Sequence, residues 1–226
     1  AKYDSVAYRA SLEEAARKPG LVVRKEGDVD AALKNADKVI TGEYYLPHLA
    51  HVSMEPPVAV ANVTGDKAEI WAPVQSPGGT REDVAKTLGI PAENVRLDSP
   101  YVGGGFGSKL GINAEAVAAA VAARDLGRPV SVTMTRPQVF DLAHRRSETR
   151  QRILLACDAR GLLTGIGHEV LVSNLPDTAF SEPVTQATPF TYQAAHRQVV
   201  HAVARVHRSC AGSVRAPGEA VGVTVF

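Results

Sequence analysis

A glycine-rich stretch is the part of this chain best suited to bind a ligand, with the sequence Tyr101-Val102-Gly103-Gly104-Gly105-Phe106-Gly107-Ser108-Lys109. Glycine has no Cβ atom, so its backbone can adopt positive φ angles and lie directly against a ligand. Backbone N–H groups in such a turn, beside the start of a helix, are suited to an anion such as phosphate. A tight strand-to-helix connection without a ligand could have the same sequence.

Two further motifs offer side chains that can bind a polar group. Gln75 lies at the end of a predicted strand, where its amide can both donate and accept hydrogen bonds. Arg215 precedes Ala216-Pro217-Gly218, and its guanidinium group can bind a phosphate or a carbonyl as a fixed fork. A surface glutamine and a structural arginine would have the same sequence.

The glycine stretch does not match the common nucleotide-binding motifs. Residues 103–107 lack the Gly-x-Gly-x-x-Gly spacing, and no acidic residue ends the next predicted strand at 130–134. Lys109 is not in the Gly-Lys-Ser/Thr context of a P-loop. The sequence therefore disfavours a nicotinamide, flavin or nucleoside triphosphate site.

Three other groups of residues could carry chemistry, and each has a plainer interpretation. His48, His51 and Glu55 lie in a proline-bounded loop, but no further ligand completes a metal site nearby, so we expect a hydrogen-bonded structural loop. The basic cluster at 144–146 is interpreted as a solvated turn. Ser108 could be a nucleophile, yet no acid–base partner can be assigned to it.

Composition indicates an ordinary globular protein of 226 residues, with 22% charged and 45% hydrophobic residues and a net charge of +1. This charge gives no reason to expect nucleic acid as a partner, and no apolar run is long enough to span a bilayer. Cys157 and Cys210 could pair or stay free, and they are too few to hold an iron–sulfur cluster. Because the chain starts without Met and stops within an apolar run, we expect a segment of a longer protein.

The pattern of elements predicts an α+β fold with mixed sheets and packed helices in two lobes. A polar N-terminal segment over 1–35 precedes the main portion at 36–226, which has lobes at about 36–135 and 145–210. Strands are expected over 21–24, 39–46, 58–63, 68–74, 94–97, 130–134, 150–158, 162–173 and 198–206. Helices are expected over 12–18, 28–36, 80–88 (capped by Thr80), 114–125 (capped by Asn113) and 135–143. The strand, glycine loop, helix and strand over 94–134 resemble a βαβ unit.

The ordered set of Gln75, residues 103–107 and residues 215–218 resembles the molybdopterin-binding large subunit of the xanthine oxidase family, which includes aldehyde oxidoreductases. Residues 54–57 and 80–85 resemble its bacterial aldehyde and isoquinoline branch. The resemblance covers the chain from about residue 35 to the end.

The resemblance implies roles for the matching residues. Gln75 would approach an oxo ligand of molybdenum or the pterin, and Arg215 would lie near the cofactor and the substrate channel. Gly104, Gly105, Phe106 and Gly107 would pass beside the metal, which the family holds through the pterin dithiolene and not through these residues. Phe106 would wall the substrate pocket. Purine-hydroxylating members carry a Glu where this chain has Leu110, so an aldehyde or an aromatic N-heterocycle is expected.

The resemblance also implies the chemistry and the partners. The cofactor would be molybdopterin, as such or as its cytosine dinucleotide, and the reaction a hydroxylation with water as the oxygen source. Electrons would leave through iron–sulfur clusters on a partner chain. The family's catalytic base is a Glu in the C-terminal part of the subunit, so no catalytic residue is assigned here, to Glu55 or Glu219 in particular. We therefore expect a partner that supplies the C-terminal part, and no activity from this chain alone. The alternatives are a non-catalytic assembly segment of the same fold and a hydrolase using Ser108.

Overall fold

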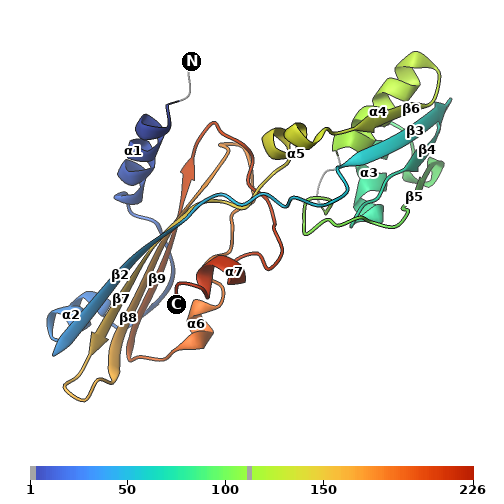
Figure 1. Cartoon of the computed structure of the whole chain (residues 1–226). Helices are drawn as coiled ribbons and strands as arrows, with labels where there is room; N and C mark the ends of the chain where they lie inside the picture. The colour runs from blue at the N-terminus through green and yellow to red at the C-terminus, as the bar shows by residue number, and fades with distance from the viewer. Residues whose placement is uncertain (1–3, 111–113) are drawn as a thin grey trace. The chain divides into compact units, whose positions relative to one another are not determined.

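The structure is a computed structural model that describes residues 4–110 and 114–226. It divides into two units, one formed by residues up to Leu49 together with Arg145–Phe226 and the other by Ala50–His144. The described part of each unit is built on one sheet with helices beside it (Figure 1). The predicted α+β class with mixed sheets is confirmed. Among the described residues, no helix is both long and apolar enough to cross a membrane.

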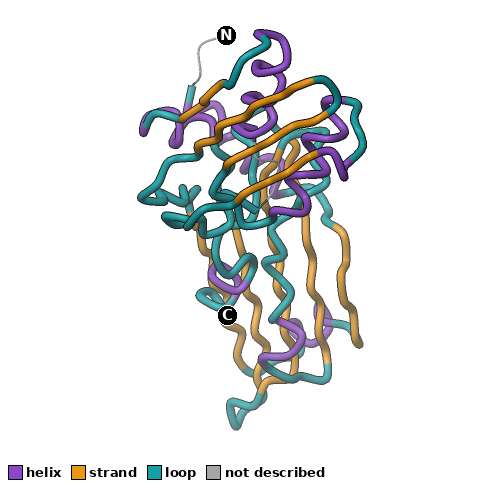
Figure 2. The backbone as a smooth tube through the Cα atoms, turned by 90° about the vertical axis from the view of Figure 1, so that its right-hand side faces the viewer, coloured by secondary structure: helices purple, strands orange, loops and turns teal. Residues whose placement is uncertain are grey.

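The sheet of the first unit has the strand order β1-β9-β8-β7-β2 in the described chain. Its long strands run side by side (Figure 2). Their bounds are β1 Leu21–Glu26, β2 Lys38–Leu46, β7 Thr149–Cys157, β8 Leu163–Asn174 and β9 His196–Arg205. Neighbouring strands are antiparallel except β8 and β9, which are parallel. The predicted hairpin turn between β7 and β8 is confirmed, because the Asp158 carboxylate accepts hydrogen bonds from the N–H groups of Arg160 and Leu162.

The second unit contains a sheet in the order β5-β4-β3-β6 within the described residues, with α3 and α4 packed on it. The bounds are β3 Val58–Thr64, β4 Lys67–Trp71, α3 Pro77–Leu88, β5 Val95–Asp98, α4 Ala114–Leu126 and β6 Val130–Thr133, with a 3₁₀ turn at Ala92–Asn94. Alternate residues of β3 are buried, as expected for a strand with one face on the core. The apolar buried face of α4 consists of small residues, which lets the helix lie close to the sheet: Ala116, Ala119, Ala120 and Ala123.

Two details of this unit differ from the sequence prediction. Helix α3 begins at Pro77 after Ser76, so Thr80 is a buried residue inside the helix and not its N-cap. Strands β5 and β6 lie at opposite edges of the sheet, so the strand–loop–helix–strand run does not join neighbouring strands as a simple βαβ unit would. The predicted cap Asn113 lies outside the described residues.

The N-terminal segment contributes strand β1 to the five-stranded sheet. Helix α1 spans Ser5–Ala16 and starts earlier than predicted, because the Asp4 carboxylate caps it by accepting from the N–H groups of Val6 and Ala7. Asp28 caps α2, Val29–Lys34, near its predicted position. Strand β2 pairs with β7 along its whole length and β1 pairs with β9, so the units divide the chain differently from the predicted lobes.

The remaining helices are short. Helix α5, Arg136–Leu142, follows Thr135 as predicted and starts with a capping box. Helices α6, Thr188–Thr191, and α7, Glu219–Gly222, lie in segments for which the sequence predicted no helix. Cys157 and Cys210 are both free thiols.

Candidate functional site

The glycine stretch lies against the side chain of Gln75. The amide oxygen Oε1 of Gln75 accepts a hydrogen bond from the N–H of Gly107 at 3.0 Å and another from the N–H of Lys109 at 3.3 Å. The backbone N–H of Gln75 donates to the carbonyl of Lys109 at 2.8 Å. Of the two ends of the amide, only the oxygen can accept a hydrogen bond from a backbone N–H, so these contacts fix the orientation of the Gln75 amide. Its NH₂ group remains as a hydrogen-bond donor.

Close approach explains the glycines of this stretch. A Cβ atom on Gly105 would lie 2.2 Å from Oε1 of Gln75, so only glycine lets the two segments meet this way. The φ angles are +92° at Gly104 and +108° at Gly107. Phe106, between them, has a φ of +56°, which is uncommon for a bulky residue and costs about 1–3 kcal/mol. The loop therefore holds a strained backbone, which is a feature of ligand-binding segments.

The loop turns its apolar side chains outward. Gly105, Gly107 and Lys109 are buried, whereas Phe106 is 43% exposed and Leu110 is 49% exposed. The hydroxyl of Ser108 donates to the carbonyl of Gly105 at 2.8 Å. The structure thus brings Gln75, the glycines, Phe106 and Leu110 together in the second unit.

An ion pair that the sequence did not reveal closes the loop. Lys109 is fully buried, and its Nζ atom contacts Oε2 of Glu55. The same carboxylate oxygen accepts a hydrogen bond from the N–H of Gly103 at 3.0 Å. Opposite charges in the two motifs were visible in the sequence, but nothing in it gave the distance between them.

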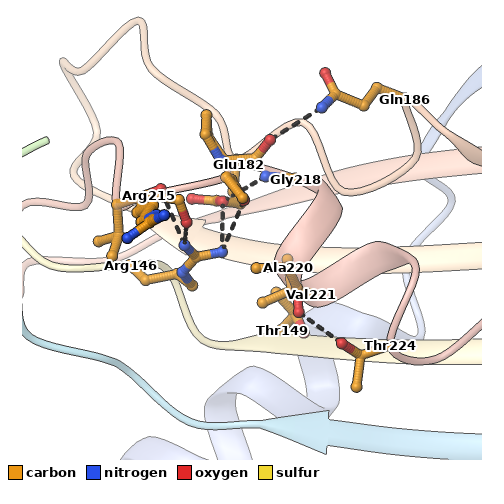
Figure 3. A network of polar contacts seen from close by, with 12 residues as sticks. Arg146, Thr149, Glu182, Gln186, Arg215, Gly218, Ala220, Val221 and Thr224 are labelled. Atoms are coloured by element: carbon orange, nitrogen blue, oxygen red, sulfur yellow. Dashed lines mark hydrogen bonds and ion pairs between the residues drawn. The ribbon is translucent and has the colours of Figure 1, made fainter. Parts of the chain in front are cut away.

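Arg215 lies in the first unit, on a loop that Arg146 holds. The Nη2 atom of Arg146 donates to the carbonyl oxygens of Val214 and Arg215, and Nη1 donates to that of Ala216 at 3.3 Å. Figure 3 shows the guanidinium group beside this loop and Glu182. Arg215 has an exposed side chain, and Ala216 has a φ of +55°. Arg146 is 3% exposed, so the prediction of a solvated turn at 144–146 was wrong for this residue.

Glu182 supports the same loop from a buried position. Its Oε1 atom accepts from the N–H of Gly218 at 2.8 Å and lies 3.5 Å from Nη1 of Arg146. Burial raises the pKa of this carboxyl group, against the opposing effects of the Gly218 N–H and the Arg146 charge. The backbone at 214–218 is therefore held at both ends by buried charged groups.

A second polar cluster surrounds Glu148. This carboxylate accepts hydrogen bonds from Tyr8, Tyr45 and Ser173, and Nε2 of His48 lies 3.3 Å from its Oε1 atom. Burial disfavours the charged carboxylate, but the contacts with His48 and the tyrosines outweigh it and lower the pKa of Glu148 to about 2. His48 thus serves a hydrogen-bonded network, in agreement with the structural interpretation of its loop. A cavity of about 530 Å³ adjoins this cluster.

Comparisons with known proteins agree on one family. Residues 14–226 match the molybdopterin cofactor-binding domain family. The molybdenum-binding subunit PaoC of an aldehyde oxidoreductase from Escherichia coli (strain K12) is 38% identical over 197 residues, which are 87% of this chain and 27% of that protein. Subunit gamma of the 6-hydroxypseudooxynicotine dehydrogenase complex from Paenarthrobacter nicotinovorans is 32% identical over 200 residues, 85% of this chain and 25% of that protein.

Solved structures show the same fold. The aldehyde oxidoreductase from Desulfovibrio gigas superposes with a TM-score of 0.76 at 22% identity, over 92% of this chain and 23% of that one. Quinoline 2-oxidoreductase from Pseudomonas putida 86 gives a TM-score of 0.74 at 24% identity, over 87% of this chain and 27% of that one. The chain spans about a quarter of the length of these relatives. These matches confirm the resemblance drawn from the sequence motifs, and the chain belongs to the molybdopterin cofactor-binding domain family, as found in the molybdenum-binding subunits of aldehyde oxidoreductases.

Proposed function

We propose that the chain forms one wall of the cofactor site in a molybdenum hydroxylase that oxidises an aldehyde or an aromatic N-heterocycle. The observation that carries this proposal is the glycine loop, whose backbone is folded over Gln75 with Phe106 facing out. Because the chain belongs to the molybdopterin cofactor-binding domain family, we propose molybdopterin as the ligand of this loop.

The residues present fit a molybdenum–pterin cofactor. Gly103 is exposed and Gly104 is partly exposed, so a large planar group can approach their bare backbone beside the exposed amide of Gln75, against which Gly105 packs. Among the described residues, no group of three His, Cys, Asp or Glu side chains could hold a metal ion. A cofactor whose pterin brings its own sulfur ligands is compatible with such a surface.

Each of the proposed cofactor-binding residues has a distinct part. The amide oxygen of Gln75 holds the loop, so its NH₂ group would donate to the cofactor or to an oxygen carried by it. The backbone of Gly104, Gly105 and Gly107 would lie against the cofactor. The exposed guanidinium group of Arg215 would donate to an anionic or carbonyl oxygen, while Arg146 fixes its backbone.

When bound, the cofactor would supply two-electron oxidation with water as the source of oxygen, and the protein would supply position and electrostatics. Phe106 and Leu110 would line the substrate pocket with apolar surface. Leu110 offers no carboxylate to hold a purine ring, and a relative named as the molybdenum-binding subunit of an aldehyde oxidoreductase supports an aldehyde as the substrate.

The partners are part of the proposal. A chain or segment that supplies the C-terminal cofactor-binding part would contribute the glutamate base, and an iron–sulfur subunit would accept the electrons. The cofactor would be molybdopterin or its cytosine dinucleotide.

The two alternatives make different predictions. A hydrolase based on Ser108 is disfavoured, because the hydroxyl donates to the carbonyl of Gly105 and not to a base. A non-catalytic assembly segment would keep this fold and bind no molybdenum.

The test is metal analysis of the intact protein that contains this sequence, purified together with any other chains bound to it. We expect molybdenum in the wild type, oxidation of an aldehyde or heterocycle, and loss of both in Gln75→Ala but not in Gln193→Ala, a control at an exposed loop position. Wild-type protein without molybdenum would contradict the proposal and favour the assembly segment.

A further inference from the structure

We propose that Glu55 and Lys109 are positioning residues that set the conformation of the glycine loop for the cofactor. This inference rests on the proposed function for its purpose, but the contacts that carry it belong to the second unit alone.

Glu55 ties together the two ends of the loop. At the start, the Glu55 carboxylate accepts from the N–H of Gly103 at 3.0 Å, and the Glu55 N–H donates to the carbonyl of Gly103 at 3.0 Å. At the end, the same carboxylate pairs with the buried ammonium group of Lys109. The six residues that follow Gly103 are therefore closed into a ring through one side chain.

The segment that carries Glu55 is itself held in place. The guanidinium group of Arg136 donates to the carbonyl of Ser53 at 2.7 Å and to that of Met54 at 2.7 Å. Glu55 also packs directly on the loop, because a Cβ atom on Gly103 would lie 2.6 Å from the Cβ of Glu55. The carboxylate thus has a fixed position from which to act on the loop.

A need for stability alone does not explain this arrangement. Replacing a buried ion pair by apolar side chains of similar size is often neutral or stabilising, because desolvation of the charges is costly. Apolar side chains, however, cannot accept the hydrogen bond that the N–H of Gly103 donates. Phe106 keeps a positive φ angle in the middle of the loop, and such a conformation persists only where the surroundings over-determine it. The pair therefore holds a strained loop in one shape.

The experiment compares two uncharged double variants in the intact protein. Glu55→Gln/Lys109→Met keeps an oxygen that can accept from Gly103, and Glu55→Leu/Lys109→Met does not. The control is Glu69→Leu/Arg96→Met, which removes an exposed ion pair between β4 and β5 of the same unit. The measurements are thermal melting, molybdenum content, the Mo(V) electron paramagnetic resonance signal and hydrogen exchange of the amides at 103–109.

We expect the control to keep its molybdenum, the wild-type Mo(V) signal and the wild-type loop exchange. The Gln/Met variant lacks the link to Lys109 but keeps the acceptor for Gly103, so its molybdenum content and loop exchange should lie between those of the control and those of the Leu/Met variant. The Leu/Met variant should stay folded but lose most of its molybdenum, and its loop amides should exchange about tenfold faster. Equal molybdenum content and equal loop exchange in the two double variants would overturn the inference.

Absence of molybdenum from the wild type and misfolding of the Leu/Met variant each lead to a different comparison. If even the wild type holds no molybdenum, the proposed function fails, and loop exchange alone decides whether Glu55 and Lys109 position the loop. If the Leu/Met variant does not fold, Lys109→Met is compared with Arg96→Met. Faster exchange at 103–109 in Lys109→Met supports the inference, and equal exchange contradicts it.

Discussion

Gly105 packs so closely on Gln75 that a Cβ atom at position 105 would lie 2.2 Å from the amide oxygen of Gln75. Gly105→Ala must therefore displace that amide and break its hydrogen bonds to Gly107 and Lys109. We expect a loss of about 1–3 kcal/mol in the free energy of unfolding, measured in urea. The matched control Gly78→Ala meets open space in α3 and should be neutral or stabilising by up to about 1 kcal/mol. Equal stability of the two variants would show that this contact is dispensable.

Arg146 should be among the most sensitive positions in the first unit. Arg146→Met removes the donor to three consecutive carbonyl groups and the partner of Glu182, so we expect a loss of about 3–5 kcal/mol. Arg152→Met, which removes an exposed ion pair with Glu169, should cost less than about 1 kcal/mol. Chemical unfolding of both variants measures the difference, and similar losses would refute the role given to Arg146.

The buried imidazole of His168 should make the protein sensitive to mild acid. Burial, with a smaller effect from His201, lowers the pKa of His168 to about 4. The unfolded state therefore binds a proton first, and stability should fall by up to about 3 kcal/mol as the pH drops from about 6.5 to 4. His168→Gln, which can still bond Gln151 and Thr188, should reduce this dependence, whereas the exposed His207→Gln should keep it. Unchanged pH dependence in His168→Gln would count against the assignment.

The pKa of Glu148 is also lowered, and Glu148 should affect stability in a lower pH window than His168 does. Its pKa is lowered to about 2, so it stabilises the folded state above about pH 4.5 and loses this effect as the pH falls to 2. Glu148→Gln should therefore lower stability at pH 7 by up to about 3 kcal/mol and change it little at pH 2. Glu169→Gln, at an exposed ion pair, is the control. A uniform loss at all pH values would indicate packing and not charge.

Substitution of Phe106 tests the proposed contact with substrate separately from the shape of the loop. Glycine accepts the +56° φ angle without strain, so Phe106→Gly should preserve stability and molybdenum content. The missing ring should raise KM for the aldehyde or heterocycle by about tenfold if it walls the pocket. Steady-state kinetics of the intact protein tests this, and an unchanged KM would remove Phe106 from the pocket.

The local structure of the chain was largely predictable from its sequence. The turn at 158–161, the hairpin of β3 and β4 and the small-residue face of α4 follow from patterns that span a few residues. The pairing of β2 with β7 was not predictable, because it joins strands separated by the whole second unit and leaves no local signal.

The candidate site was predictable only in its motifs. Gln75, the glycine stretch and Arg215 stood out because together they resemble the ordered motifs of a known family. Arg146, Glu182, Glu55 and Lys109 did not, since a charged residue is far more often at the surface than buried. Their burial depends on partners distant in the sequence, and only the folded structure brings those partners together.

The central claim is that the backbone at 104–107 lies beside a molybdenum cofactor. The most direct measurement is an anomalous difference map, collected at the molybdenum edge from crystals of the intact protein. Our account predicts a molybdenum peak next to Gly104–Gly107 and the side chain of Gln75. A peak elsewhere, or none in active protein, would contradict it.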